Sequence, residues 1–181
     1  MKKTRLKALL LPGFNGSAEQ PMLLALAERL EAEGIDAIRR APAPGRPSVD
    51  LASETTWLLN ELKPLGSNVC VVGRSFGGRL ALRAAHVHSM LCLGLLGFPL
   101  RPPKKRRPED ERLLNGVQVP TLIVQGSVDE LGPMRVIQST MKGNDNIALH
   151  VLKGAGHAFG RHEAEALDRM VQFVTSVRDA A

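Results

Sequence analysis

The sequence predicts an α/β fold, namely a doubly wound, mostly parallel six-stranded sheet with helices on both faces. Short apolar runs alternate with longer amphipathic stretches from end to end of the chain, a pattern typical of a parallel sheet covered by helices. The chain has 181 residues, and a domain of about 150 residues already buries about 70% of the surface that its unfolded chain exposes. We therefore expect one domain over residues 1–181, built around one sizeable core.

Six apolar runs have the length of buried strands. They comprise residues 6–11, 35–40, 68–72, 90–95, 121–125 and 147–152. The longer stretches between and after these runs predict helices at residues 21–33, 49–62, 79–88 and 163–177. Pro21 suits the first turn of the first helix. Two proline-rich pieces, residues 41–47 and 101–108, are interpreted as loops within the same domain.

The apolar segments also bear on the cellular location of the protein. Cys70 and Cys92 both lie in apolar runs, so we interpret them as reduced core residues rather than as parts of a disulfide scaffold. No apolar run approaches the roughly 20 residues needed to cross a bilayer, and we expect no membrane partner. The basic start imitates a signal peptide, but Lys7, Pro12 and Gly13 interrupt its apolar part. The sequence therefore predicts a cytoplasmic location.

The charge balance is basic, with 24 Lys and Arg against 18 Asp and Glu, a formal net charge of +6. We expect no nucleic-acid partner, because only 3% of the residues are aromatic and single-strand and RNA binders need aromatic platforms for bases. Much of the excess is local, in the loop at residues 101–107 and at Lys2, Lys3, Arg5 and Lys7. That loop could be a targeting or phosphate-binding patch. We favour a solvated connection, because three acidic residues at 109–111 partly neutralise it.

The strongest chemical signal is the sequence G-R-S-F-G-G at residues 73–78, between a predicted strand and a predicted helix. A nucleophile on such a sharp turn needs small residues two positions before and two after it, and Gly73 and Gly77 meet that need. Ser75 is therefore the predicted nucleophile. Phe76 begins the helix, so its backbone N–H and the helix dipole can both point at a developing oxyanion. The alternative is an ordinary glycine-rich turn.

A serine hydroxyl needs a general base, and the base needs an acid that fixes its tautomer. Asp129 follows the strand at residues 121–125, and His157 follows the last strand. The order Ser75, Asp129, His157 matches the order Ser, acid, His, and the carboxyl ends of parallel strands share one side of a sheet. We expect the three side chains to meet. The alternative that Asp129 is simply a turn residue stays open.

Other residues compete for these roles. Glu130 is the rival for the acid, and His150 and His162 are rivals for the base. His86 and His88 are expected late in the helix after Ser75, pointing away from the sheet edge.

Acyl transfer needs a second oxyanion donor, normally from the loop after the first core strand. In that loop Gly13 and Gly16 let the backbone turn back toward the nucleophile. The N–H of Phe14 is the predicted donor, with Asn15 as second choice. The loop also has a plain structural explanation, in which Ser17 caps the following helix.

These motifs resemble the α/β-hydrolase superfamily over residues 6–177. The chain is most similar to a small lidless branch, the testis-expressed and NSL-complex-subunit hydrolase-like family, and to dienelactone-hydrolase-like proteins. The resemblance is carried by the glycine-rich loop with residues 20–22, and by residues 72–79, 97–100, 119–121, 126–130 and 156–157. It implies Ser75 as nucleophile, Asp129 as acid, His157 as base, and the N–H groups of Phe14 and Phe76 as oxyanion donors.

The resemblance implies a serine hydrolase that cleaves a carboxylic ester or thioester of a small-molecule acyl substrate through an acyl-enzyme, with no metal or organic cofactor. Only about 22 residues separate the fourth and fifth predicted strands, where a cap would be inserted, so we expect a minimal fold with no cap domain. Arg74 or the basic loop could then favour an acidic acyl group, although Arg74 has an equally good structural explanation. The oligomeric state stays open.

One residue pair departs from the family pattern. Many relatives carry His-Gly at the start of the oxyanion loop, whereas this chain has Pro12 and Gly13. A backbone donor does not require that His side chain, but the geometry of the loop is then less constrained. Two alternatives therefore stay open: a hydrolase-like binding or scaffold module with little turnover, and a dienelactone-type hydrolase, which would usually have Cys at the position of Ser75.

Overall fold

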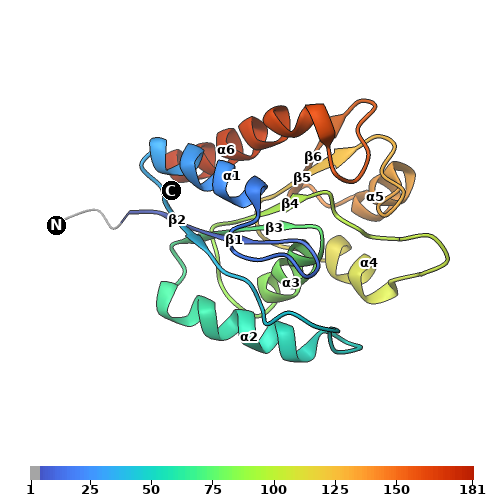
Figure 1. Ribbon diagram of the computed structural model, residues 1–181, viewed down its shortest axis with the longest axis horizontal. Coiled ribbons are helices and arrows are strands. Elements are labelled where there is room, and N and C mark those ends of the chain that lie inside the picture. The colour runs from blue at the N-terminus through green and yellow to red at the C-terminus, as the bar shows by residue number, and fades with distance from the viewer. Residues whose placement is uncertain (1–4) are drawn as a thin grey trace.

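A computed structural model describes residues 5–181 as one six-stranded sheet with helices on both faces (Figure 1). The strands are β1 (Lys7–Leu11), β2 (Asp36–Arg39), β3 (Val69–Arg74), β4 (Cys92–Leu96), β5 (Thr121–Gly126) and β6 (Ile147–Leu152). All neighbouring strands are parallel, in the order β2-β1-β3-β4-β5-β6. The predicted α/β class and the six strands are confirmed, and the sheet is parallel throughout rather than mostly so.

The described chain forms six α-helices and two short 3-10 helices. They are α1 (Pro21–Ala32), α2 (Ala52–Leu62), η1 (Lys63–Leu65), α3 (Phe76–Ala85), α4 (Pro108–Asn115), α5 (Met134–Met141), η2 (Gly160–His162) and α6 (Glu163–Ala180). Four of the α-helices were predicted, with α2 beginning three residues later than expected. Helix α3 ends at Ala85, so the expectation that His86 and His88 lie within it is wrong.

Helices α4 and α5 were not predicted, because each is only eight residues long and commits few residues to the core. Leu113 and Leu114 are the buried apolar residues of α4, and Val136 and Ile137 are those of α5. Such short segments show too little periodicity to be recognised. Pro108, which we placed at the end of a loop, is the first residue of α4, a position that proline favours.

Alternation along the strands divides the core into two layers. Helices α1 and α6 pack on one face of the sheet, and α2, α3, α4 and α5 contribute buried residues to the other. Figure 1 shows α1 and α6 above the sheet and α2 and α3 below it. The four inner strands, β1, β3, β4 and β5, are therefore shielded on both faces, which explains why they read as nearly continuous apolar runs.

Two neighbouring strands in the middle of the sheet each carry a buried cysteine. Cys70 and Cys92 pair in register on β3 and β4, and both are buried free cysteines, as predicted. Their sulfur atoms are 2.7 Å apart. The hydrogen bond to Cys70 and burial raise the pKa of Cys92 far above its ordinary value, so this thiol stays protonated and packs as a small apolar group.

The topology brings the loops that bear the candidate residues to one edge of the sheet. The chain runs outward from β1 to β2 and then returns to β3 on the other side of β1. The carboxyl ends of β1 and β3 therefore flank a topological switch point, where ligands bind in open α/β sheets. Phe14 follows β1 and Ser75 follows β3 at this point.

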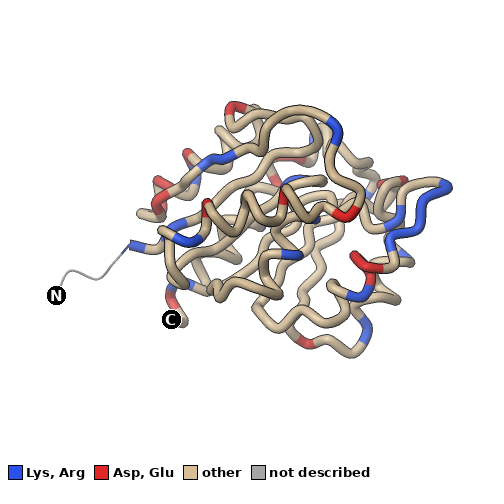
Figure 2. The backbone as a smooth tube through the Cα atoms, turned by 90° about the horizontal axis from the view of Figure 1, so that it is seen from below, with Lys and Arg blue, Asp and Glu red and all other residues tan. Residues whose placement is uncertain are grey.

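Positive charge gathers beside the same edge. Figure 2 shows Lys and Arg concentrated in the loop between β4 and α4, which protrudes at the right end of the molecule. At the N-terminus, Arg5 pairs with Asp36, and Lys2 and Lys3 lie outside the described residues. Within residues 5–181, no helix combines the length and the apolar character that crossing a membrane requires.

Candidate active site

Ser75 occupies the sharp turn between β3 and α3. Its backbone has φ 48° and ψ −109°, a conformation that costs free energy for a residue with a side chain. A Cβ at Gly73 would lie 2.3 Å from the nitrogen of Gly78, and one at Gly77 would lie 2.6 Å from the carbonyl oxygen of Pro12. Larger residues at either position would therefore push the turn apart, as the sequence pattern predicts.

The three predicted side chains form a continuous hydrogen-bonded chain. Ser75 Oγ lies 2.9 Å from His157 Nε2, and His157 Nδ1 lies 2.8 Å from Asp129 Oδ2. The Asp129 side chain is fully buried, whereas His157 is partly exposed. A buried carboxylate facing Nδ1 favours the tautomer that carries its proton on Nδ1. Nε2 then presents its lone pair to the hydroxyl of Ser75, and Arg74 Nη1 lies 3.4 Å from the same nitrogen.

The carboxylate of Asp129 is itself held by three donors. Gln125 Nε2 donates to Oδ2 at 2.8 Å, and the backbone N–H groups of Leu131 and Gly132 donate to Oδ1 at 2.8 and 3.4 Å. Gln125 is fully buried at the end of β5, and its Oε1 accepts a 2.7 Å hydrogen bond from Phe98 N–H. We did not predict this residue, although an amide side chain at the end of an apolar strand, just before the acid loop, was a usable signal.

The residues that were alternatives for the acid and the base interact with other groups. Glu130 is exposed, His150 pairs with Glu165 at 2.8 Å, and His162 lies 3.9 Å from the same glutamate. His86 Nε2 and His88 Nε2 contact the backbone carbonyls of Leu113 and Gly66 respectively. Among the histidines of the described chain, His157 is the one that contacts Ser75.

Two backbone N–H groups flank the nucleophile as candidate oxyanion donors. Phe76 is the first residue of α3, so its N–H has no partner within the helix. Phe14 lies in the loop after β1, and its ring meets that of Phe76 edge to face with centroids 5.9 Å apart. Within residues 5–181, neither N–H donates a hydrogen bond. Both are available for an oxygen atom of a ligand.

The loop that carries Phe14 is fixed differently from our expectation. Gln20 is the N-terminal cap residue of α1, and its side-chain oxygen accepts a 3.1 Å hydrogen bond from Gly13 N–H. Ser17 accepts from the N–H of Glu19 instead, so the expectation that it caps the helix is wrong. The side chain of Asn15 accepts from Gly45 N–H. Gln20 thus connects the oxyanion loop to the start of α1.

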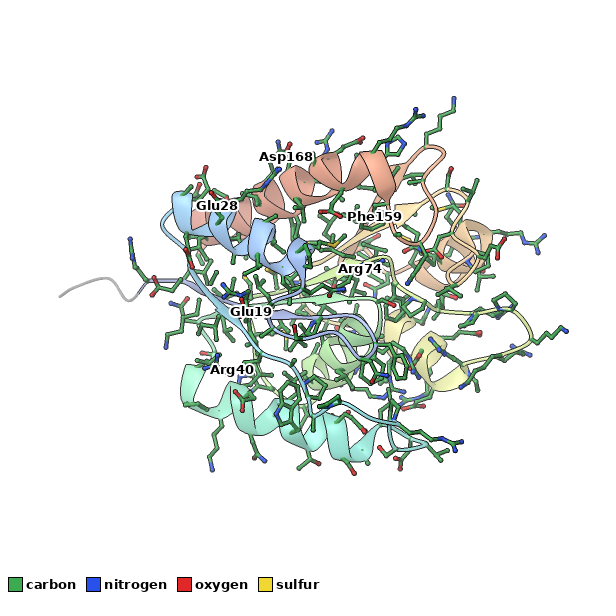
Figure 3. All side chains as sticks on the ribbon, in the orientation of Figure 1. Glu19, Glu28, Arg40, Arg74, Phe159 and Asp168 are labelled. Atoms are coloured by element: carbon green, nitrogen blue, oxygen red, sulfur yellow. The ribbon has the colours of Figure 1, made fainter. Side chains whose placement is uncertain are left out.

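Arg74, next to Ser75, holds the loop that carries His157. It is only 7% exposed, and its guanidinium donates to the backbone carbonyls of His157, Leu96 and Gly97. It lies over the ring of Phe159 with its Cζ 5.2 Å from the ring centroid (Figure 3). Burial lowers the pKa of Arg74. These contacts give Arg74 a structural role, and it does not line the cleft described next.

A cleft of about 760 Å³ opens in front of Ser75. One wall comes from the loop before α2, with Val49 and Leu51, and the opposite wall comes from the loop before α4, with Pro99 and Pro102. In the described chain, the whole connection from β4 to β5 contains only this loop and α4, so there is no cap domain over the cleft. The site is open to solvent.

Asp110 of α4 lies fully buried in the wall of this cleft, between two arginines of α3. Its Oδ2 lies 2.6 Å from Arg79 Nε, and its Oδ1 lies 2.5 Å from Arg83 Nη1. Both arginine side chains are largely buried. The carboxylate thus connects α4 to the helix that begins at Ser75.

We predict that Asp110→Asn lowers the free energy of unfolding by about 3 to 5 kcal/mol, because removing one partner leaves buried charges uncompensated. Urea denaturation monitored by circular dichroism measures this change. Glu109→Gln is the matched control, because Glu109 is more than half exposed and its one ion pair among residues 5–181 is with Arg112 on the same helix. It should leave stability nearly unchanged, and equal effects of the two variants would contradict the structural role of Asp110.

Among residues 5–181, no group of three or more His, Cys, Asp or Glu side chains is placed to hold a metal ion.

Comparison with known proteins gives a family match and several structural neighbours. The sequence profile of a family described as "Alpha/beta hydrolase domain" matches residues 17–180. No curated protein matches the chain.

Several solved structures share the fold. Est1E from Butyrivibrio proteoclasticus has a TM-score of 0.80 at 17% identity, covering 97% of this chain and 89% of that chain. A monoacylglycerol lipase from Paleococcus ferrophilus has a TM-score of 0.75 at 15% identity, covering 94% of each chain. A dienelactone hydrolase from Anabaena variabilis has a TM-score of 0.70 at 20% identity, covering 97% of this chain and 86% of that chain.

Proposed function

Because this chain belongs to the alpha/beta hydrolase domain family, we propose that it is a serine hydrolase that cleaves a carboxylic ester or thioester of a small cytoplasmic molecule. The observation that carries this proposal is the unbroken hydrogen-bonded chain from Ser75 through His157 to Asp129, with Ser75 at the wall of an open cleft. The lipase and the dienelactone hydrolase among its structural neighbours add support for ester chemistry.

In the proposed reaction, His157 Nε2 accepts the hydroxyl proton as Ser75 Oγ forms a bond to the carbonyl carbon of the substrate. The carbonyl oxygen becomes an oxyanion, and the N–H groups of Phe14 and Phe76 donate to it. The bond to the leaving oxygen or sulfur then breaks, and the protonated His157 gives its proton to that atom. An acyl group is left on Ser75.

Water completes the cycle by the same route. His157 removes a proton from the water molecule as its oxygen attacks the acyl carbon, and the proton returns to Ser75 when the acid leaves. Asp129 stabilises the imidazolium form of His157 through its hydrogen bond to Nδ1. Its three donors, including Gln125, keep the carboxylate aimed at Nδ1.

A fluorophosphonate probe tests this proposal directly, because it reacts with an activated serine irrespective of the natural substrate. We expect wild-type protein to be labelled stoichiometrically, with the added mass on the peptide that contains Ser75. Under the same conditions it should hydrolyse 4-nitrophenyl butyrate above the uncatalysed rate.

The competing function is a binding or scaffold module that retains the fold. Exposed Ser176 of α6 serves as the internal reference for non-specific labelling, since it lies outside the cleft. A folded protein that is labelled no faster at Ser75 than at Ser176, and that leaves the ester intact, would support the scaffold function and refute the hydrolase.

A further inference from the structure

The cleft in front of Ser75 carries more positive than negative charge. Its acidic lining residues are Asp50, Glu109 and Asp110, and its basic ones are Arg46, Arg79, Arg83, Lys105, Arg106 and Arg107. Most of these basic residues come from the loop before α4 and from α3. The loop at residues 101–107, which we interpreted as a solvated connection, therefore also forms part of the wall of the cleft.

The acidic residues of the cleft already have partners. Asp110 lies between Arg79 and Arg83, and Glu109 forms an ion pair with Arg112 on the outer side of α4. Asp50 accepts a hydrogen bond from the backbone N–H of Ala52 at the start of α2. The positive charge of the remaining basic residues is therefore not cancelled by these carboxylates.

Arg107 is the basic residue that stands out among them. It is partly buried at the wall of the cleft, and one Nη atom donates to the backbone carbonyl of Pro99. Its Nε is buried and has no hydrogen-bond partner in the described part of the chain. Arg107 forms no ion pair with any residue between 5 and 181. A partly buried guanidinium without a carboxylate is costly unless an anion joins it.

The surroundings of Arg107 explain this cost. Burial, followed by the nearby positive charges of Arg79 and Arg83, lowers its pKa to about 10. The side chain therefore remains charged at neutral pH. One carboxylate, that of Asp110, faces three guanidinium groups in this region, so an added anion would be attracted rather than repelled.

The rest of the cleft is apolar. Val49 is fully exposed, Phe14 is 58% exposed, and Leu51, Pro99 and Leu131 are among the other apolar residues of the lining. A ligand that fits these walls has an apolar section beside Ser75 and an anionic end at Arg107. Exposed basic residues such as Arg106 at the mouth can raise the rate at which an anionic ligand arrives.

We propose that the substrate of this enzyme carries an oxyanion, a carboxylate or a phosphate, that Arg107 binds in the cleft beside Ser75. This inference rests on the proposed hydrolase function and specifies its substrate class. Guanidinium matches both anions through paired N–H donors. The oxyanion can lie on the acyl part or on the leaving part of the ester, and the experiment separates the two.

The test compares three esters: neutral 4-nitrophenyl butyrate, mono-4-nitrophenyl adipate with a carboxylate on the acyl part, and the butyrate of a carboxylated 4-nitrophenol. We expect wild-type kcat/KM to be higher for one of the anionic esters than for the neutral one. Arg107→Gln should lower that preference by about 10- to 100-fold, as expected for loss of a hydrogen bond to a charged group. Arg112→Gln removes the same charge from the outer side of α4 and should leave the preference unchanged.

Binding to the Ser75→Ala protein separates this inference from the proposed function. Calorimetry with adipate and with inorganic phosphate measures the anion site without any turnover, and we expect Arg107→Gln in the same background to weaken binding about 10-fold or more. If wild-type protein hydrolyses no ester, the hydrolase fails while the anion site is still tested. Absence of binding to both anions, or equal effects of Arg107→Gln on neutral and anionic esters, would overturn the inference.

Discussion

Replacing Ser75 with Ala is expected to lower kcat for 4-nitrophenyl butyrate by a factor of roughly 10⁶, the loss seen when the nucleophile of a hydrogen-bonded triad is removed. The reason is that no acyl-enzyme can form when Oγ is absent. The residual rate should come from the N–H groups of Phe14 and Phe76, which still stabilise the oxyanion when water attacks directly. Single-turnover and steady-state assays with wild-type and variant proteins measure the change.

Folding must be separated from chemistry in this comparison. The alanine side chain keeps the Cβ of Ser75 in the strained turn, so the variant should retain the wild-type circular dichroism spectrum and melting temperature. Ser176→Ala removes an exposed hydroxyl from α6 and should keep full activity. A Ser75→Ala protein within ten-fold of the wild-type rate, a margin of about 1.4 kcal/mol, would exclude Ser75 as the nucleophile.

The turn at Ser75 was predictable because its small residues stand at fixed offsets in the sequence. Gly73 and Gly77 lie two residues on either side of Ser75, where a Cβ would meet neighbouring backbone. The four inner strands were predictable for a similar reason, since each is buried on both faces and reads as a short apolar run. Sequence spacing alone carries this information.

The surroundings of the site depend on contacts between distant segments, and these could not be read from spacing. Gln125 supports Asp129 because its other hydrogen bonds reach Phe98, 27 residues away. Arg74 reaches His157 across 83 residues. The basic loop was predicted to be solvated from its own acidic neighbours, and Arg101 does pair with Glu111. The position of Arg107 in the cleft follows from the packing of α4 on α3, which the sequence did not reveal.

These long-range contacts lead to the second large effect, the loss of the acid. Asp129→Asn should lower kcat for 4-nitrophenyl butyrate by roughly 10⁴-fold, as in triads where the acid becomes an amide and the base takes the wrong tautomer. The structure gives a specific reason. Both carboxylate oxygens accept hydrogen bonds, Oδ2 from Gln125 and His157, and Oδ1 from Leu131 N–H.

An asparagine at this position has only one accepting oxygen, so either orientation of its amide fails. If the NH₂ group faces His157, it meets the NH₂ group of Gln125, which cannot turn over because its oxygen is held by Phe98 N–H. If it faces the other way, it meets the N–H of Leu131. Either clash leaves a buried donor unpaired and should also lower stability by about 1 to 3 kcal/mol.

The two effects can be measured on the same protein and compared with Glu130→Gln, which neutralises the exposed neighbouring carboxylate. That control should retain both activity and melting temperature, because Glu130 makes no contact with His157 in the described structure. For Asp129→Asn, a lower melting temperature with full activity would mean that Asp129 only shapes the turn. We expect Asp129→Asn to lose both activity and stability, because the three groups that donate hydrogen bonds to the Asp129 carboxylate cannot all be satisfied by an amide.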